Sequence, residues 1–334
     1  MPGGQERALR RRIKSVQSTK KITRAMELIS ASRIAKAQQK VAAARPYAER
    51  ITEVIRNLSA AGAGGGQALL TTRDHVASVG VVVVTADRGL AGGYNSGALK
   101  VAEGIIAEAE AAGQAAKVYV VGRKGVNYFR YRGRAVQASF IGFTDNPSYE
   151  DARNIARTVV DDFEAGVVDR VELAYTQFLS AGTQRPISRR FIPLEPESLP
   201  GAAAAAIGET GATADYEFEP DPNSILAKLL PRYVESRLFA ALLDAAASEH
   251  AARQRAMKSA TDNAGELIKR LERQMNRARQ DAITTEIIEI ASGAEALNKE
   301  HDEVASTMSK DYFSSHDPDP FDRHDHHHHH PHGH

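Results

Sequence analysis

The sequence predicts a mixed α/β protein in which long N- and C-terminal helices pair as an antiparallel coiled coil. A small, open, Rossmann-like α/β domain is expected between them. Two observations support this prediction. Near both ends of the 334-residue chain, apolar residues recur in steps of three and four, the pattern of a coiled-coil seam. The middle of the chain instead alternates β-branched runs with amphipathic stretches, as open α/β sheets do.

The first long helix is expected from Gln5 to Leu58. Its seam comprises Ile34, Ala37, Val41, Ala44, Ala48, Ile51, Ile55 and Leu58. An earlier stripe, out of register with this seam, comprises Ile22, Met26 and Ile29. We therefore expect the seam to change face near Ser30. Pro46 should disturb the helix locally, because proline lacks the N–H that the helix needs.

The second long helix is expected after residues 219–222, with Asn223 or Ser224 as the N-cap, and reaches Leu297 with Pro231 as a breaker near its start. Its main seam comprises Met257, Ala264, Ile268, Leu271, Met275, Ala278 and Ala282. A continuation displaced by one residue comprises Ile283, Ile287, Ile290, Ala294 and Leu297. Roughly 75 helical residues span about 110 Å. Neither helix can bury its stripe alone, so the two are expected to pair.

The central region reads as alternating strands and helices. We predict strands at 79–85, 117–121, 135–140, 171–179 and 187–194, and helices at 98–112 and 149–164. An Ala/Gly-rich loop follows at 201–214. The predicted divisions are an N-terminal coiled-coil helix at 1–60, the central α/β domain with its loops at 61–222, a C-terminal coiled-coil helix at 223–298, and a disordered His-rich tail at 299–334.

Composition excludes several classes of protein. With no cysteine, the chain forms no disulfide and has no thiol nucleophile. No run of 18 apolar residues predicts a membrane span, and the N-terminus lacks an apolar signal region, so we expect a cytoplasmic protein that is not exported. Net charge is +1, but residues 7–50 are strongly basic. Such a segment favours an acidic partner, a phosphate or a membrane surface.

The most enzyme-like feature is the glycine-rich turn from Thr85 to Asn95, which follows a strand and precedes a helix. Turns at this position can cradle phosphate. This turn lacks the Lys-Ser/Thr ending of a phosphate loop, and its glycines do not have the dinucleotide-binding spacing. Two interpretations remain: a nucleotide-binding α/β enzyme with a coiled-coil arm, or, as we favour, a tight turn that packs against another element.

Other candidate chemistry is weaker. His75, His250 and His301 lie in different segments without a nucleophile elbow, which disfavours a hydrolase. Glu286 and Glu289 share a helical face but have no histidine beside them, so a solvated or partner-facing role is favoured over metal binding. The basic helix has no stacking aromatics, which disfavours nucleic acid. The terminal histidines could bind a divalent metal, but a purification tag or a solvated tail is favoured. We predict no catalytic residue, cofactor or functional metal.

Four blocks of the sequence closely resemble the gamma subunits of F-type ATP synthases. The blocks are residues 10–33, the turn at 87–95, residues 247–264, and the C-terminal set Ala278, Arg279, Gln280, Ile283, Thr284, Thr285, Glu286, Glu289, Gly293 and Ala294. They occur in family order and at family spacing from about Leu9 to Leu297. Joint order over most of a chain makes the resemblance specific, whereas the glycine turn alone would not.

The resemblance implies a central rotor shaft, present once per complex and non-catalytic, inside a bacterial alpha3-beta3 hexamer. It implies further contacts with the epsilon subunit and the ring of c subunits, and membrane association at the cytoplasmic face only through the complex. By motif, the beta-contact and coupling residues are Met26, Arg253, Arg279, Gln280, Thr284, Glu286 and Glu289, with Met26 near Arg253 and Gln280. The residues near the c ring and epsilon are Tyr216, Glu217, Glu219 and Asp221. Without cysteine, a thiol switch of the chloroplast kind cannot operate, and the tail after Leu297 has no family counterpart.

Overall fold

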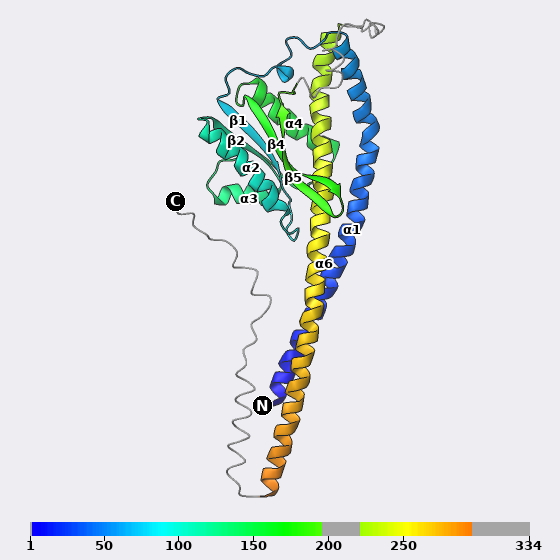
Figure 1. Ribbon diagram of the computed structural model, residues 1–334, viewed down its shortest axis with the longest axis vertical. Coiled ribbons are helices and arrows are strands. Elements are labelled where there is room, and N and C mark those ends of the chain that lie inside the picture. The colour runs from blue at the N-terminus through cyan, green and yellow to red at the C-terminus, as the bar shows by residue number, and fades with distance from the viewer. Residues whose placement is uncertain (1, 196–220, 296–334) are drawn as a thin grey trace. The chain divides into compact units, whose positions relative to one another are not determined.

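The computed structural model describes residues 2–195 and 221–295 (Figure 1). Its elements are α1 (Pro2–Ala60), the 3-10 helix η1 (Ala68–Leu70), β1 (Ser78–Val84), α2 (Tyr94–Ala111), β2 (Ala115–Val121), α3 (Arg123–Tyr131), β3 (Ala138–Phe140), α4 (Tyr149–Glu164), β4 (Arg170–Ser180), β5 (Thr183–Ile192) and α6 (Pro222–Ala294). The described residues form two compact units. The larger contains residues 26–257, and the smaller contains 2–25 and 258–295.

The two long helices are present as predicted. Helix α1 has 59 residues and α6 has 73, close to the expected bounds. Pro46 lies inside α1 and Pro231 inside α6, and neither ends its helix. A helix can continue past a proline when packing on both sides outweighs one lost hydrogen bond. The predicted tail and the Ala/Gly loop lie outside the described residues, and the predicted domain division stays a prediction.

The sheet of the larger unit has the strand order β3-β2-β1-β4-β5. The first four strands are parallel, and β5 runs antiparallel to β4. Every residue of β1 is buried, because helices cover both faces. Val81 and Val83 pack with α2 and α3, whereas Val82 and Val84 pack in the main core with α4, α1 and α6. The predicted open α/β domain is confirmed.

Helix α3 was not predicted from the sequence, and β3 is shorter than expected. The helix is only nine residues long, and within it only Gly125 and Phe129 are buried, so its apolar pattern is brief. It begins after Gly122, whose φ is +97°. A Cβ at Gly122 would lie 2.4 Å from the Thr85 carbonyl oxygen, so glycine is required where α3 approaches the end of β1.

The seam of α1 from Ile34 to Leu58 is confirmed, since all its members are buried or half-buried. The expected stripe at Ile22, Met26 and Ile29 is wrong. Ile22 is 61% exposed and Ile29 50%, and Met26 is half-buried. The buried positions are the polar residues Thr23, Glu27 and Ser30. These positions continue the three-and-four spacing of the later seam. The seam therefore stays on the same face of α1 instead of changing face near Ser30, and its side chains at these three positions are polar.

In the smaller unit, α1 and α6 pack through an apolar cluster. Its members are Ile13, Val16, Ala264, Leu267 and Leu271, with Leu9, Ile268 and Met275 packed against them. The Thr23 and Thr261 hydroxyl oxygens are 2.7 Å apart, and Gly265 lies beside Lys20. The two helices run antiparallel, so residues earlier in α1 lie opposite residues later in α6. Extending the pairing of Thr23 with Thr261 places Pro2 opposite about Ala282.

The expected continuation of the seam at the end of α6 is wrong for this chain. Ile283, Ile287 and Ile290 are 43%, 61% and 66% exposed, and Ala294 is also exposed. The reason is the helix register, since no described residue of α1 lies opposite α6 beyond about Ala282. Leu297 lies outside the described residues.

Candidate functional site

Side chains tie the glycine-rich turn between β1 and α2 to its surroundings. The buried Thr85 hydroxyl donates to the Val121 carbonyl at 2.7 Å and accepts from the Gly125 amide at 2.9 Å. Asn95, in the first turn of α2, accepts from the Ala86 amide at 2.8 Å. The start of the turn is therefore held by the end of β2, by α3 and by the first turn of α2.

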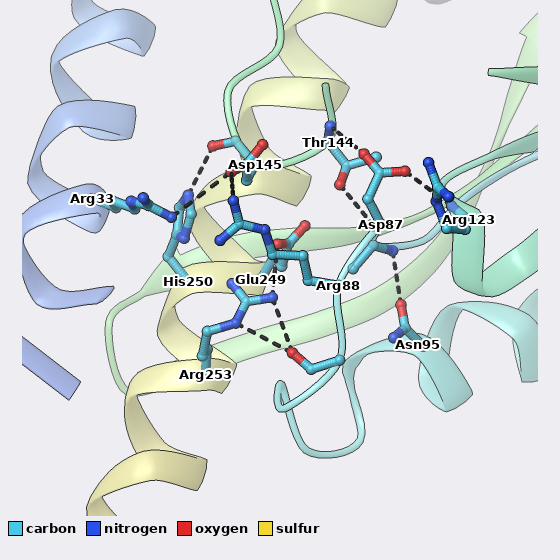
Figure 2. A network of polar contacts seen from close by, with 12 residues as sticks. Arg33, Asp87, Arg88, Asn95, Arg123, Thr144, Asp145, Glu249, His250 and Arg253 are labelled. Carbon is cyan, nitrogen blue, oxygen red and sulfur yellow. Dashed lines mark hydrogen bonds and ion pairs between the residues drawn. The ribbon is translucent and has the colours of Figure 1, made fainter. Parts of the chain in front are cut away.

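Asp87 occupies the centre of this arrangement (Figure 2). Its carboxylate accepts from the backbone amides of Arg123 at 3.0 Å, Gly142 at 2.8 Å and Thr144 at 3.2 Å. The Thr144 hydroxyl in turn accepts from the Asp87 amide at 3.0 Å. Arg123 is the first residue of α3, and a helix N-terminus attracts negative charge. The chain's own aspartate therefore lies where a phosphate would otherwise be favoured.

The turn also packs on α6. Ala86, Ala91, Tyr94 and Ala252 form a buried cluster. The Gly89 carbonyl accepts from Nε and Nη2 of Arg253 at 3.4 Å and 3.3 Å. These contacts confirm the interpretation of a tight turn that packs against another element.

A buried ion pair on α6 anchors this contact. Nη2 of Arg253 lies 3.0 Å from Oε2 of Glu249, and their side chains are 7% and 0% exposed. Burial raises the pKa of Glu249, and the guanidinium of Arg253 opposes that rise. Arg253 thus bridges a buried carboxylate and the backbone of the glycine turn.

Asp145 joins three further segments (Figure 2). Its Oδ2 lies 3.7 Å from Arg33 on α1 and 3.8 Å from Arg88 in the turn. Its carbonyl oxygen lies 2.8 Å from Nε2 of His250 on α6, so that nitrogen carries the proton. Burial lowers the pKa of His250, the hydrogen bond to the Asp145 carbonyl opposes that shift, and the charges of Arg253 and Arg33 lower the pKa further. His250 is therefore neutral at neutral pH.

Sequence reasoning missed most of this network. In the sequence, Asp87 stands out only as part of the glycine motif, and the pattern does not predict the roles of Arg33, Asp145 and Glu249. The i, i+4 spacing of Glu249 and Arg253 was the one available signal for their pairing. Asp145 gave no signal, because its partners come from segments far apart in the sequence.

The predicted contact residues fall into two environments. Arg253 is buried and bound to its own chain, and Met26 is half-buried. The remaining predicted beta-contact residues are exposed on the last turns of α6: Arg279, Gln280, Thr284, Glu286 and Glu289. The Thr284 hydroxyl donates to the Gln280 carbonyl. The expected approach of Met26 to Arg253 and Gln280 stays a prediction.

The residues predicted near the c ring and epsilon lie before α6. Asp221 is exposed, and its carbonyl accepts from the amides of Ser224 and Ile225 at the start of that helix. Tyr216, Glu217 and Glu219 lie outside the described residues. Among the described helices, none combines the length and apolar character that a bilayer crossing needs.

The larger unit defines a class of protein in which a pair of long helices carries a docked α/β domain. A family model described as ATP synthase matches residues 5–297. The ATP synthase gamma chain of Frankia casuarinae is 54% identical over 301 residues, covering 88% of this chain and 98% of that one. The Salinispora arenicola gamma chain is 46% identical over 314 residues, covering 90% and 99%. The chain belongs to the ATP synthase gamma chain family.

Solved structures share the fold. A chain of the Euglena gracilis mitochondrial ATP synthase, in an OSCP/F1/c-ring structure, aligns with a TM-score of 0.58 at 16% identity, covering 89% of this chain and 97% of that one. A chain from the central stalk and c-ring structure of the Tetrahymena thermophila enzyme aligns with a TM-score of 0.51 at 22% identity, covering 72% and 99%. Family and fold together identify a gamma-chain subunit of an ATP synthase, and neither favours the nucleotide-binding enzyme.

Proposed function

We propose that this chain is the non-catalytic rotor shaft that couples c-ring rotation, driven by protons, to ATP synthesis and hydrolysis at beta-subunit sites. The observation that carries the proposal is the exposed end of α6. There Ile283, Ile287 and Ile290 recur in steps of four and three, so they lie on one face of the helix, and all are exposed. An apolar stripe of this kind indicates a surface that a partner covers.

The polar residues of the same stretch suit a moving contact. Arg279 and Gln280 offer directional hydrogen-bond donors, and Glu286 and Glu289 carry negative charge, all exposed. Such groups can pair with different neighbours as a shaft turns inside an alpha3-beta3 hexamer. A single tight contact would instead trap one angle, because a partner shifts an equilibrium by its preference for one state.

The start of α6 is proposed as the end nearest the c ring and the epsilon subunit. Asp221 is exposed there, and Tyr216, Glu217 and Glu219 precede it in the chain. Under this proposal the chain reaches the cytoplasmic face of the bacterial membrane only through the complex.

A non-catalytic role is supported by how the most enzyme-like residues are used. Asp87 binds three backbone amides of its own chain, and Glu249 pairs with Arg253. His250 binds the Asp145 carbonyl. Each of these groups contributes to holding the turn, the loop at 142–145 and α6 together.

The proposal is tested by co-expressing the chain with alpha and beta subunits of the same organism and purifying through beta. We expect one copy per three alpha and three beta subunits, with MgATP hydrolysis that depends on the chain. Arg279→Ala with Gln280→Ala should lower turnover, whereas Lys100→Ala with Arg157→Ala, two exposed cations of the α/β domain, should not. No association, or several copies per hexamer, would overturn the shaft. Equal turnover of the two double variants would overturn only the contact assignment.

A further inference from the structure

The larger unit contains a cavity of about 740 Å³ that the glycine-turn network does not use. It is bounded by α1, α4, the β4–β5 pair and α6, all within residues 26–257. Sites for small organic molecules usually have volumes of about 300–1,000 Å³. The cavity is therefore large enough for a molecule with a body and a head group, and much larger than an inorganic ion requires.

The floor of the cavity is apolar and aromatic. Leu173 and Phe191 line it and are almost fully buried. The Tyr149 ring packs edge-on against Tyr47 and Phe239, with centroids 5.8 Å and 5.5 Å away. Rings held edge-to-face in this way present a stable surface for a flat or alkyl group.

The rim of the cavity is strongly basic. Among the described residues that line it, Asp244 is the only acidic one and five are arginines: Arg45, Arg153, Arg189, Arg190 and Arg237. Two of them are paired elsewhere, Arg153 with Glu150 at 3.1 Å and Arg190 with Glu195 at 3.6 Å. In the described part of the chain, Arg45, Arg189 and Arg237 form no ion pair. Positive charge at the cavity thus exceeds what the lining carboxylate can balance.

Arg189 and Arg237 both line this space. Within the described residues, the Arg237 side chain forms one hydrogen bond, a long one of 3.4 Å to the Arg190 carbonyl. Burial lowers the pKa of Arg237, and the charge of Arg189 lowers it further, whereas Tyr233, Tyr175 and Glu195 oppose the shift. Burial also raises the pKa of Asp244, and a backbone hydrogen bond from Phe178 and the charge of Arg189 oppose that rise. An added anion between the two guanidiniums would relieve their repulsion.

We propose that this cavity binds a small organic anion whose phosphate or carboxylate head lies between Arg189 and Arg237 and whose aromatic or alkyl body lies against Phe191 and Tyr149. Guanidinium groups match both kinds of head through paired N–H donors. The apolar floor supplies affinity that a bare ion could not use. This site is independent of the rotor function proposed above.

The test uses the purified full-length chain and calorimetric titration with 1-naphthyl phosphate. Inorganic phosphate supplies the head alone and 1-naphthol the body alone. Dodecanoate supplies a carboxylate on an alkyl chain, and so separates a lipid-derived ligand from an aromatic phosphate ester. We expect one site, with 1-naphthyl phosphate or dodecanoate binding at least about tenfold more tightly than either partial probe, because both halves of the cavity contribute.

The matched variants are Arg189→Gln and Arg185→Gln, both on β5 and both exposed, of which only Arg189 lines the cavity. Arg189→Gln should weaken binding by about tenfold or more, the usual scale for a lost charged hydrogen bond, and Arg185→Gln should leave it unchanged. Arg237→Gln should give a similar loss. If Arg237→Gln fails to fold, Arg189→Gln tests the site by itself. Absence of binding, or equal affinity of the two exposed variants, would overturn the site. Binding of 1-naphthol as tight as that of its phosphate ester would overturn the arginine-bound head.

Discussion

Helix α6 carries two polar regions with opposite environments. Around Glu249 and Arg253 the charges are buried and bound to the same chain. After Ala278 the side chains of Arg279, Gln280, Glu286 and Glu289 are exposed. Both regions contain motifs of the gamma family. The difference teaches that a family motif can either be buried and hold the subunit together or lie exposed, where we propose that partners contact it.

Replacing Arg253 gives the largest expected effect. Arg253→Ala leaves Glu249 buried without its cation, so we expect a loss of about 3–5 kcal/mol in the free energy of unfolding. The double variant Glu249→Leu with Arg253→Met, which removes both charges, should lose less. Denaturant unfolding of the isolated chain measures both. A loss below about 1 kcal/mol for Arg253→Ala would show that this pair does not anchor the glycine turn, and the comparison would fail.

Gly122→Ala tests the turn itself. The new Cβ would meet the Thr85 carbonyl at 2.4 Å in a backbone of φ +97°, so we expect a loss of about 2–4 kcal/mol. Gly113 is the matched control, since its φ is +76° but nothing lies within 4 Å of a Cβ there. Gly113→Ala should therefore lose only about 1 kcal/mol. Thermal unfolding of both variants separates the steric clash from the backbone strain, and equal losses would contradict a close approach at Gly122.

The pH dependence of stability tests the buried region of α6, where His250 lies between Glu249 and Arg253. The folded pKa of His250 is lowered by burial, so the unfolded chain binds the proton more readily. The contribution of His250 to the free energy of unfolding is complete above its unfolded pKa of about 6.5, and it is lost as the pH falls below that value. His250→Gln keeps an N–H donor for the Asp145 carbonyl and should flatten the stability profile between about pH 5 and 7. An unchanged profile would assign the pH dependence to other groups.

The smallest effect on folding is expected at the exposed end of α6. Ile287→Gln should change the unfolding free energy by no more than about 0.5 kcal/mol, because Ile287 is 61% exposed. Leu271→Gln, at a position 1% exposed, should lose about 3 kcal/mol. ATP turnover of the assembled complex should nevertheless fall with Ile287→Gln. Normal turnover would indicate that no partner uses this stripe.

Much of the fold was predictable because its signals are local. Heptad spacing predicts both long helices, and the apolar run at 79–85 predicts a strand covered on two faces, observed as β1. The buried Thr23 was not predictable from its own segment, since its hydroxyl partner, Thr261, is 238 residues away. Asp145 was missed for the same reason. A polar side chain can occupy a buried position only when a hydrogen-bonding partner is present there. The sequence around that side chain does not identify a partner from a distant segment.

Asp87 has a consequence for how the α/β domain keeps its shape. In a nucleotide-binding relative of this architecture, a bound anion would order the start of a helix only while the ligand is present, at a strength set by its concentration. Here the anion is part of the chain, and its effective concentration at the Arg123, Gly142 and Thr144 amides never changes. The Asp87 contacts that hold the turn are therefore independent of the cell's supply of nucleotide, whose level rises and falls with the output of the complex.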